Sequence, residues 1–531
     1  MAIILQRDSR SGITYVYQSV SWWDKEKKQS RSRRTLVGRL DKESNEVVPT
    51  DGRMKKEKAS RVSAKPRQFA SSKRLFYGAT YLLDEIGGKL GLTEDLRRCF
   101  PDMQKQLLSL VYYLVLEDKN PLYRFEKWGF THKHPHGEDI PSQRSSEIFT
   151  EVTESAIQQF FRLQGKRRTE REYWVYDTTS ISSYSETLKQ AQYGFNKEGD
   201  SLPQINLAML FGEQSGLPLY YRKLAGNIPD VKTVKTLLAD MGDLGFEKVK
   251  LVMDRGFYSA DNINGLFKEH LKFLVSVRTG LKLVQNELDR VYDDFRTFEH
   301  YSEDYQLYSI TVPSEWGYAQ TRPYKKDVLE KKHRIYIHLY YNIDRAAEDQ
   351  KNFDRKLIGL RQELLSGKRV AEHEKLYSKY FFIKDTPARG IQVKANEQAL
   401  KRARRYYGFF ALLSNEKMDS ITALELYRKK DLIEKAFGNI KERLSMRRTL
   451  VSSEQSLNGK LFVEFVALIY LSYLNNQMQR SHLYKDYTMA SLLDKLDLIE
   501  CYETQGRKLR IGEILDSQRK LYQALDIDPP I

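Results

Sequence analysis

The stretch from Glu172 to Arg278 constrains the fold most, because its hydrophobic pattern changes in a fixed order. Three short apolar runs, YWVYDTTSIS, QINLAMLFGEQSG and LPLYYRKLAG, are separated by Gly-bearing turns and predict a meander of antiparallel strands. A helix capped by Asp230, a buried strand in KVKLVMD, a second helix and a buried strand in KFLVSVR follow. The order βββαβαβ predicts an α/β fold built on a mixed sheet.

Acidic residues occupy defined places in this pattern. Asp177 lies in the first strand and Asp254 at the C-terminal end of the fourth. If the first strand is central and the fourth runs beside it, the two carboxylates meet at one edge of the fold. Glu434 lies about four turns into a single long helix predicted from ITALELYRKKDLIEKAFGNIKERL, which would pack against the sheet. Three side chains share its face at helical spacing: Tyr427, Lys430 and Lys441.

Three convergent carboxylates suit Mg²⁺, which prefers oxygen ligands and often bridges to phosphate. Two such ions about 3.5–4 Å apart can activate an attacking hydroxyl and stabilise a leaving oxygen. No His or Cys flanks these positions, and this chemistry needs none. Phosphodiester transfer is therefore the natural interpretation, although each acidic residue alone is more often a loop cap or part of a solvated ion pair.

The overall charge favours a polyanionic partner. A formal net charge of +17 and a pI near 9.3 suit phosphate binding, because Lys and Arg release the counterions condensed on nucleic acid. A basic protein without a nucleic-acid role is the alternative. Two cysteines, Cys99 and Cys501, suggest neither a disulfide framework nor a zinc site and fit a reducing cytosol.

No membrane role is expected. The longest apolar run, at 461–474, is shorter than the roughly 20 residues that a bilayer span needs and contains Glu464, so it predicts a core helix. The N-terminus shows no export signal. We therefore expect a cytoplasmic protein.

Three motifs carry a resemblance to a known family. DTTSIS around Asp177, MDRGFYS around Asp254 and the spacing Tyr427-x2-Lys430-x3-Glu434 with Lys441 seven residues on resemble the signatures of DDE transposases of the bacterial insertion-sequence-four superfamily. The resemblance spans about 172–280 and 405–450. The family has Arg where this chain has Lys430, which can contact phosphate as a point charge but lacks the bidentate fork of Arg.

The resemblance implies roles for individual residues. Asp177, Asp254 and Glu434 would be the catalytic, metal-binding triad of an RNase H-like core, a mixed five-stranded sheet with helices. The triad would hold two Mg²⁺ ions, for which Mn²⁺ would substitute. The implied DNA contacts lie beside it: Tyr427, Lys430, Lys441 and Arg255.

By similarity the chain would be a DNA transposase for cut-and-paste transposition, active in the bacterial cytoplasm on the nucleoid. It would cleave at terminal inverted repeats and transfer strands into target DNA, acting on double-stranded DNA as a homodimer in a synaptic complex. Some relatives cut through a DNA hairpin and hold a splayed base on aromatic residues of a β insertion, a region in which this chain has a single tryptophan, Trp316. A core residue is the alternative for Trp316.

Two other functions stay open at this point. One is a catalytically silent DNA-binding protein derived from a transposase, for which Lys430 leaves room. The other is a metal-dependent DNA nuclease without strand transfer, because hydrolysis and joining use the same metal ions with different nucleophiles.

The expected organisation is one split catalytic domain between flanking regions. Residues 1–74 would form a β-hairpin with a basic arm, and 75–170 a helical DNA-binding domain that includes a helix pair in DIPSQRSSEIFTEVTESAIQQFF. The first segment of the catalytic core (171–280), a mainly β insertion (281–404) and the second core segment (405–453) follow. Residues 454–531 would be C-terminal helices that support dimerisation. The alternating histidines of THKHPHGED predict a solvated surface turn.

Overall fold

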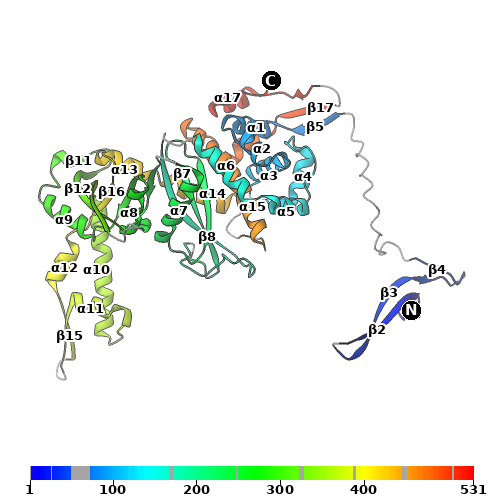
Figure 1. Cartoon of the computed structure of the whole chain (residues 1–531), viewed down its shortest axis with the longest axis horizontal. Coiled ribbons are helices and arrows are strands. Elements are labelled where there is room, and N and C mark those ends of the chain that lie inside the picture. Colours follow the sequence, from blue (N-terminus) through cyan, green and yellow to red (C-terminus); the bar gives the residue numbers. More distant parts are fainter. Residues whose placement is uncertain are drawn as a thin grey trace. The chain divides into compact units, whose positions relative to one another are not determined.

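The computed structural model divides the chain into two compact units, Met1–Ser71 and Ser72–Ile531 (Figure 1). It describes residues 2–25, 27–42, 44–49, 72–118, 120–167, 172–197, 199–246, 249–321, 328–386, 390–444, 449, 451, 453–504 and 508–531.

The first unit contains a four-stranded antiparallel sheet with the order β1-β2-β3-β4. Its strands are β1 (Ala2–Arg7), β2 (Thr14–Asp24), β3 (Gln29–Leu40) and β4 (Val47–Val48). The expected hairpin corresponds to β2 and β3, and one strand on each side extends it. Of the arm expected at 52–74, residues 52–71 lie outside the described residues, and 72–74 belong to the strand β5 (Ser72–Phe76).

The second unit is built around a nine-stranded sheet with the order β11-β12-β13-β16-β10-β9-β6-β7-β8. Five of its strands are those expected between 172 and 278: β6 (Tyr173–Ser182), β7 (Gln204–Gly212), β8 (Pro218–Ala225), β9 (Lys250–Met253) and β10 (Lys272–Val277). β6, β7 and β8 form the antiparallel meander, while β9 runs parallel to both β6 and β10. Two helices connect the last three strands as expected: α7 (Asp230–Leu244) and α8 (Ala260–Lys268).

The sheet is wider than the expected five strands, because the insertion continues it. The insertion adds β11 (Tyr301–Ser302), β12 (Leu307–Thr321) and β13 (Val328–Tyr341), and β16 (Phe409–Ser414), from the second core segment, links them to β10. β16 pairs antiparallel with β10 on one side and with β13 on the other. Alternate residues of β13, such as Ile335 and Ile337, are fully buried, which joining the larger sheet makes possible.

The insertion is also as helical as it is β. Its helices are α9 (Lys282–Val291), α10 (Ile343–Leu365), α11 (Glu374–Tyr380) and α12 (Glu397–Arg404). α10, α11, α12 and the hairpin of β14 (Phe381–Thr386) with β15 (Gly390–Ala395) share a small core of their own, which includes Leu360, Tyr377 and Leu400. The expectation of a mainly β insertion missed these helices.

One long helix, α15 (Glu454–Arg480), is the core of the helical layer beside the sheet (Figure 1). It is long and apolar enough to cross a membrane, but 89% of its apolar window is buried inside the fold, as expected of a core helix. α3 (Gln104–Leu116), α5 (Ser142–Glu151) and β8 pack against it. Its apolar residues are therefore covered within the chain, and this helix offers no apolar face to a second copy.

The expected N-terminal helical and C-terminal regions form one body. β5 (Ser72–Phe76) pairs antiparallel with β17 (Glu500–Thr504), which joins the two ends of the second unit. The expected helix pair is present as α5 and α6 (Glu154–Lys166), with Ile148 and Phe160 fully buried.

The histidine tract was expected at the surface, and this prediction is wrong. His132 and His134 are 8% and 5% exposed. His132 stacks on Trp128 and bonds to Asp497 at 2.8 Å, and His134 bonds to the Ser109 hydroxyl at 2.9 Å.

Candidate active site

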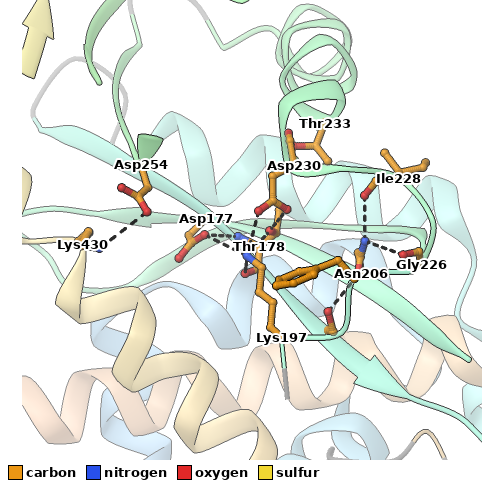
Figure 2. A network of polar contacts seen from close by, with 12 residues as sticks. Asp177, Thr178, Lys197, Asn206, Gly226, Ile228, Asp230, Thr233, Asp254 and Lys430 are labelled. Atoms are coloured by element: carbon orange, nitrogen blue, oxygen red, sulfur yellow. Dashed lines mark hydrogen bonds and ion pairs between the residues drawn. The ribbon is translucent and has the colours of Figure 1, made fainter. Parts of the chain in front are cut away.

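Parallel pairing of β6 and β9 places Asp177 and Asp254 side by side. Tyr176 on β6 lies opposite Met253, the last residue of β9; Asp177 is the next residue of β6, and Asp254 directly follows β9. They therefore lie where the parallel strands end, an edge at which open α/β sheets bind their ligands. Figure 2 shows the Asp177 and Asp254 side chains near each other.

A tyrosine and a lysine hold Asp254. The Tyr427 hydroxyl donates a hydrogen bond to Oδ1 of Asp254 at 2.5 Å, and Nζ of Lys430 lies 4.0 Å from Oδ2. Burial raises the pKa of Asp254, but the bonds from Tyr427 and from the backbone N–H of Arg255, together with the Lys430 charge, outweigh it. The pKa of Asp254 therefore lies below its ordinary value, and the carboxylate is held ionised.

Asp177 is perturbed in the opposite direction. Burial raises its pKa, and Lys197 and the N–H of Thr178, which donates to Oδ1 at 2.7 Å, offset only part of that effect. The negative charges of Asp230 and Asp254 raise the pKa of Asp177 further. A divalent cation at this position would relieve the same repulsion.

The predicted single helix around Glu434 is in fact two helices, α13 (Ser420–Arg428) and α14 (Asp431–Glu442). The backbone N–H groups of Lys429 and Lys430 bond three residues back, so the regular four-residue ladder is interrupted there. Glu434 therefore lies in the first turn of α14, not four turns into a helix.

The break still leaves the triad and Lys430 together. Nζ of Lys430 lies 3.3 Å from Oε1 of Glu434 and 4.0 Å from Asp254, and it interacts electrostatically with Asp177. Burial lowers the pKa of Lys430, but the carboxylates outweigh this effect, so its pKa lies above the ordinary value. Lys430 thus pairs with Glu434 and lies at the limit of ion pairing with Asp254, and the charge of Asp177 also favours its protonated form.

The donor set fits a divalent cation such as Mg²⁺. All the donors are carboxylate oxygens, the ligands that Mg²⁺ prefers. The Lys430 ammonium already occupies a position where the carboxylates of Asp254 and Glu434 stabilise a positive charge. In the described part of the chain, no three His, Cys, Asp or Glu side chains are close enough to form a preassembled metal site. Metal binding therefore requires the carboxylates to close on the ion and Lys430 to turn away.

Sequence reasoning missed a second cationic contact beside Asp177. Lys197, from the loop between β6 and β7, lies 3.7 Å from Oδ1 of Asp177 and 3.2 Å from Oδ2 of Asp230 (Figure 2). It also donates to the Thr178 carbonyl and hydroxyl at 2.7 and 2.8 Å. Lys197 gave no periodic signal in the sequence, because it lies in a loop that only the fold brings to this site.

Asp230 is at the site rather than capping its helix. It was expected to cap α7, but Pro229 is the N-cap residue and no side chain caps the helix there. Asp230 instead accepts a hydrogen bond from the Thr178 hydroxyl at 2.5 Å and pairs with Lys197. A fourth carboxylate thus lies next to Asp177.

The remaining predicted residues are spread more widely. Arg255 follows Asp254 directly and is exposed, so it is free to reach a ligand at the site. Lys441 is nearly buried on α14, with 9% exposure. Trp316 on β12 is 8% exposed and donates from Nε1 to Oδ1 of Asn264 at 2.9 Å, which places it in the core.

Comparison with known proteins gives a family match over this region. Residues 168–470, more than half of the chain and including all three triad positions, match the family described as "Transposase DDE domain". A search of curated proteins found no match. Among solved structures, the chain is similar to the cryo-EM structure of the piggyBac transposase synaptic complex with hairpin DNA. The identity is 11%, over 79% of this chain and 77% of that one, with a TM-score of 0.34, too low to support a structural argument.

Proposed function

The chain belongs to the transposase DDE domain family, and on this premise we propose that it performs cut-and-paste DNA transposition. It would cleave DNA at the terminal inverted repeats of its element and transfer the freed strands into a target. The observation that carries the proposal is the grouping of acidic residues at one place: Lys430 pairs with Glu434 and Asp254, and Asp254 lies beside Asp177.

Each residue has a task in this chemistry. Asp177, Asp254 and Glu434 would hold two divalent ions, Mg²⁺ or Mn²⁺, which when bound supply an activated nucleophile and stabilise the leaving oxygen. Tyr427 fixes one oxygen of Asp254 and so sets the direction of the other. Lys430, once it leaves the carboxylates, would bind a phosphate, and exposed Arg255 would contact the DNA backbone. We assign Lys441 to the same phosphate-binding group on its spacing alone.

The order of the core strands supports an RNase H-like assignment. β8-β7-β6-β9-β10 places the first strand of the meander centrally, with the two later strands parallel to it. We further infer membership of the insertion-sequence-four superfamily from the motifs around the triad, with Lys430 as the departure from its pattern.

The partners we propose are double-stranded transposon ends and target DNA, in keeping with the net charge of +17. A homodimer in a synaptic complex, acting in the bacterial cytoplasm, completes the proposal. Because α15 is buried within the chain, the dimer interface would have to use other surfaces than this helix.

The test is to incubate the purified protein with Mg²⁺ and DNA that carries its own flanking repeats, with Asp254→Asn as the matched control. We expect nicked, hairpin or joined products with the wild type and none with the variant. Absence of all three products with the wild type would refute the catalytic proposal. Products that never include joining to an added target plasmid would instead identify a nuclease.

One observation favours the silent DNA-binding alternative, namely Lys430 in the family's Arg position. Arg would restore two parallel hydrogen bonds to a phosphate. We expect Lys430→Arg to bind end DNA at least as tightly as the wild type, measured by anisotropy. If the wild type binds ends but Lys430→Arg alone cleaves them, the natural chain is a silenced transposase.

A further inference from the structure

An arm of the insertion carries a two-stranded ribbon. α10 runs away from the large sheet toward α11 and β15 (Figure 1). Leu360 and Leu364, near the far end of α10, share a small core with Phe381 at the start of β14. At 1.5 Å per residue, the ribbon of β14 and β15 therefore begins about 25–30 Å along this helix.

One face of the ribbon is covered and the other is exposed. Side chains alternate along each strand, and residues directly opposite each other share a face. Phe381 is 6% exposed and packs on the small core together with Ile383 and Val393. The exposed face consists of two cross-strand pairs, Phe382 with Lys394 and Lys384 with Gln392. It has two positive charges and no carboxylate, because Asp385 alternates onto the other face.

The arm carries an excess of positive charge. Residues 343–404 contain 15 Lys or Arg and nine Asp or Glu, a net charge of +6. The segment 293–304 of the same insertion instead contains five Asp or Glu and one Arg. A polyanion is therefore attracted to the arm and not to the insertion as a whole. A second copy of the exposed face would bring Lys against Lys, which disfavours self-association through it.

The ribbon has the size and the side chains needed to enter a groove of DNA. Each strand has six residues, which span about 20 Å, and the two strands lie about 4.8 Å apart. The major groove of B-DNA is about 12 Å wide and admits a two-stranded ribbon. There Lys can contact guanine, Gln can contact adenine and Phe can contact the thymine methyl group. All three residue types are present on the exposed face.

We propose that the exposed face of the β14–β15 ribbon docks in the major groove of the duplex whose phosphate reacts at Asp177 and Asp254. This inference rests on the proposed function, because it takes DNA as the partner. α10 sets the ribbon about 25–30 Å from the sheet, which corresponds to about seven to nine base pairs of B-DNA.

The test measures DNA binding without chemistry, by anisotropy, with the full chain carrying Asp254→Asn in Mg²⁺. Labelled duplexes contain either the terminal repeat of the element or an unrelated sequence of the same length. Each Lys withdrawn from DNA lowers the slope of log K against log salt by about 0.9, so Lys384→Gln with Lys394→Gln should lower it by about 1.8. The parent protein should then lose about 12-fold more affinity than this double variant between about 50 and 200 mM salt.

Two arms of the experiment identify which DNA the ribbon contacts. If the ribbon reads the transposon end, Gln392→Ala should weaken binding of the terminal repeat alone. If it holds target DNA, the double variant should weaken binding of both duplexes equally and Gln392→Ala should weaken neither. A duplex that extends only about six base pairs on either side of the cleavage site should bind the parent and the double variant alike, because it does not reach the ribbon.

α17 (Asp516–Ala524) provides the matched control. Arg519 and Lys520 are exposed on it, and replacing both by Gln removes the same charge without a change in the expected slope. Equal slopes for the parent and the ribbon variant, or an equal change in the control, would overturn the proposal. A change in molecular mass by light scattering without a change in DNA affinity would overturn it as well and make this face an interface between copies. A parent protein that binds neither duplex would refute the proposed function too.

Discussion

Glu464 lies in the middle of the buried run of α15 and is 3% exposed. Nζ of Lys460 lies 3.9 Å from its Oε1, and its Oε2 has no hydrogen-bond partner among the described residues. Burial raises the pKa of Glu464 to about 8, and the Lys460 charge offsets only part of this. The carboxyl group is therefore protonated in the folded protein near neutral pH.

This shift determines how stability changes with pH. The pKa of Glu464 is higher in the folded protein, about 8, than its unfolded value of 4.5. The stability that this group contributes is therefore fully present below pH 4.5 and is lost as pH rises toward 8. Each pH unit in that window costs about 1.4 kcal/mol, so the wild type should lose about 4 kcal/mol between pH 5 and pH 8 through this group. Glu464→Gln keeps the shape without ionising and should remove most of that loss.

Glu454, the first residue of the same helix, is the matched control. Burial raises its pKa, but its ion pair with Lys223 outweighs burial and leaves the pKa below the ordinary value. Glu454→Gln should therefore destabilise the protein near neutral pH and have little effect in acid, the opposite trend. Urea unfolding midpoints at pH 5, 6, 7 and 8 compare the three proteins. If Glu464→Gln and the wild type change in parallel with pH, the assigned pKa is wrong.

Three further changes test other contacts. Tyr427→Phe removes the hydrogen bond that favours ionised Asp254, so the pKa of Asp254 should rise and calorimetric Mg²⁺ binding should fail at a higher pH than in the wild type. Lys197→Met should leave Asp230 without its countercharge beside Asp177 and reduce cleavage, and adding Asp230→Asn should restore some of it. An unchanged rate in the single variant would show that the pair is dispensable. Gly459→Ala on α15 would place a Cβ 2.1 Å from a backbone oxygen of α5, so we expect a lower thermal unfolding midpoint.

The core of the fold could be predicted from the sequence where neighbours in the chain are neighbours in space. The meander of β6 to β8 follows from short turns, and the parallel strands follow from connecting helices. Asp177 and Asp254 could be predicted to meet because each lies at a defined place on one of these strands. The core helix predicted for the apolar run around Glu464 was also confirmed, because its composition alone predicts burial.

What could not be predicted depends on contacts between distant segments. β16 pairs with both β10 and β13 and so extends the sheet into the insertion. No local sequence pattern indicates which edge of a sheet a strand will pair with. The break before Glu434 occurs at lysines, without the Pro or Gly that usually marks one. Asp230 and Lys197 reach Asp177 only once the loop and α7 are in place.

The pairing of β5 with β17 has a consequence for synthesis of the chain. Phe76 lies opposite Glu500, more than 400 residues further along. At about 5–20 residues per second, a ribosome needs roughly 20–80 s to make the partner strand. The helices that pack against α15, namely α3 and α5, are likewise synthesised almost as long before α15 itself. A nascent chain therefore keeps β5 unpaired until the residues of β17 have been made, and premature termination before residue 500 leaves this edge open permanently.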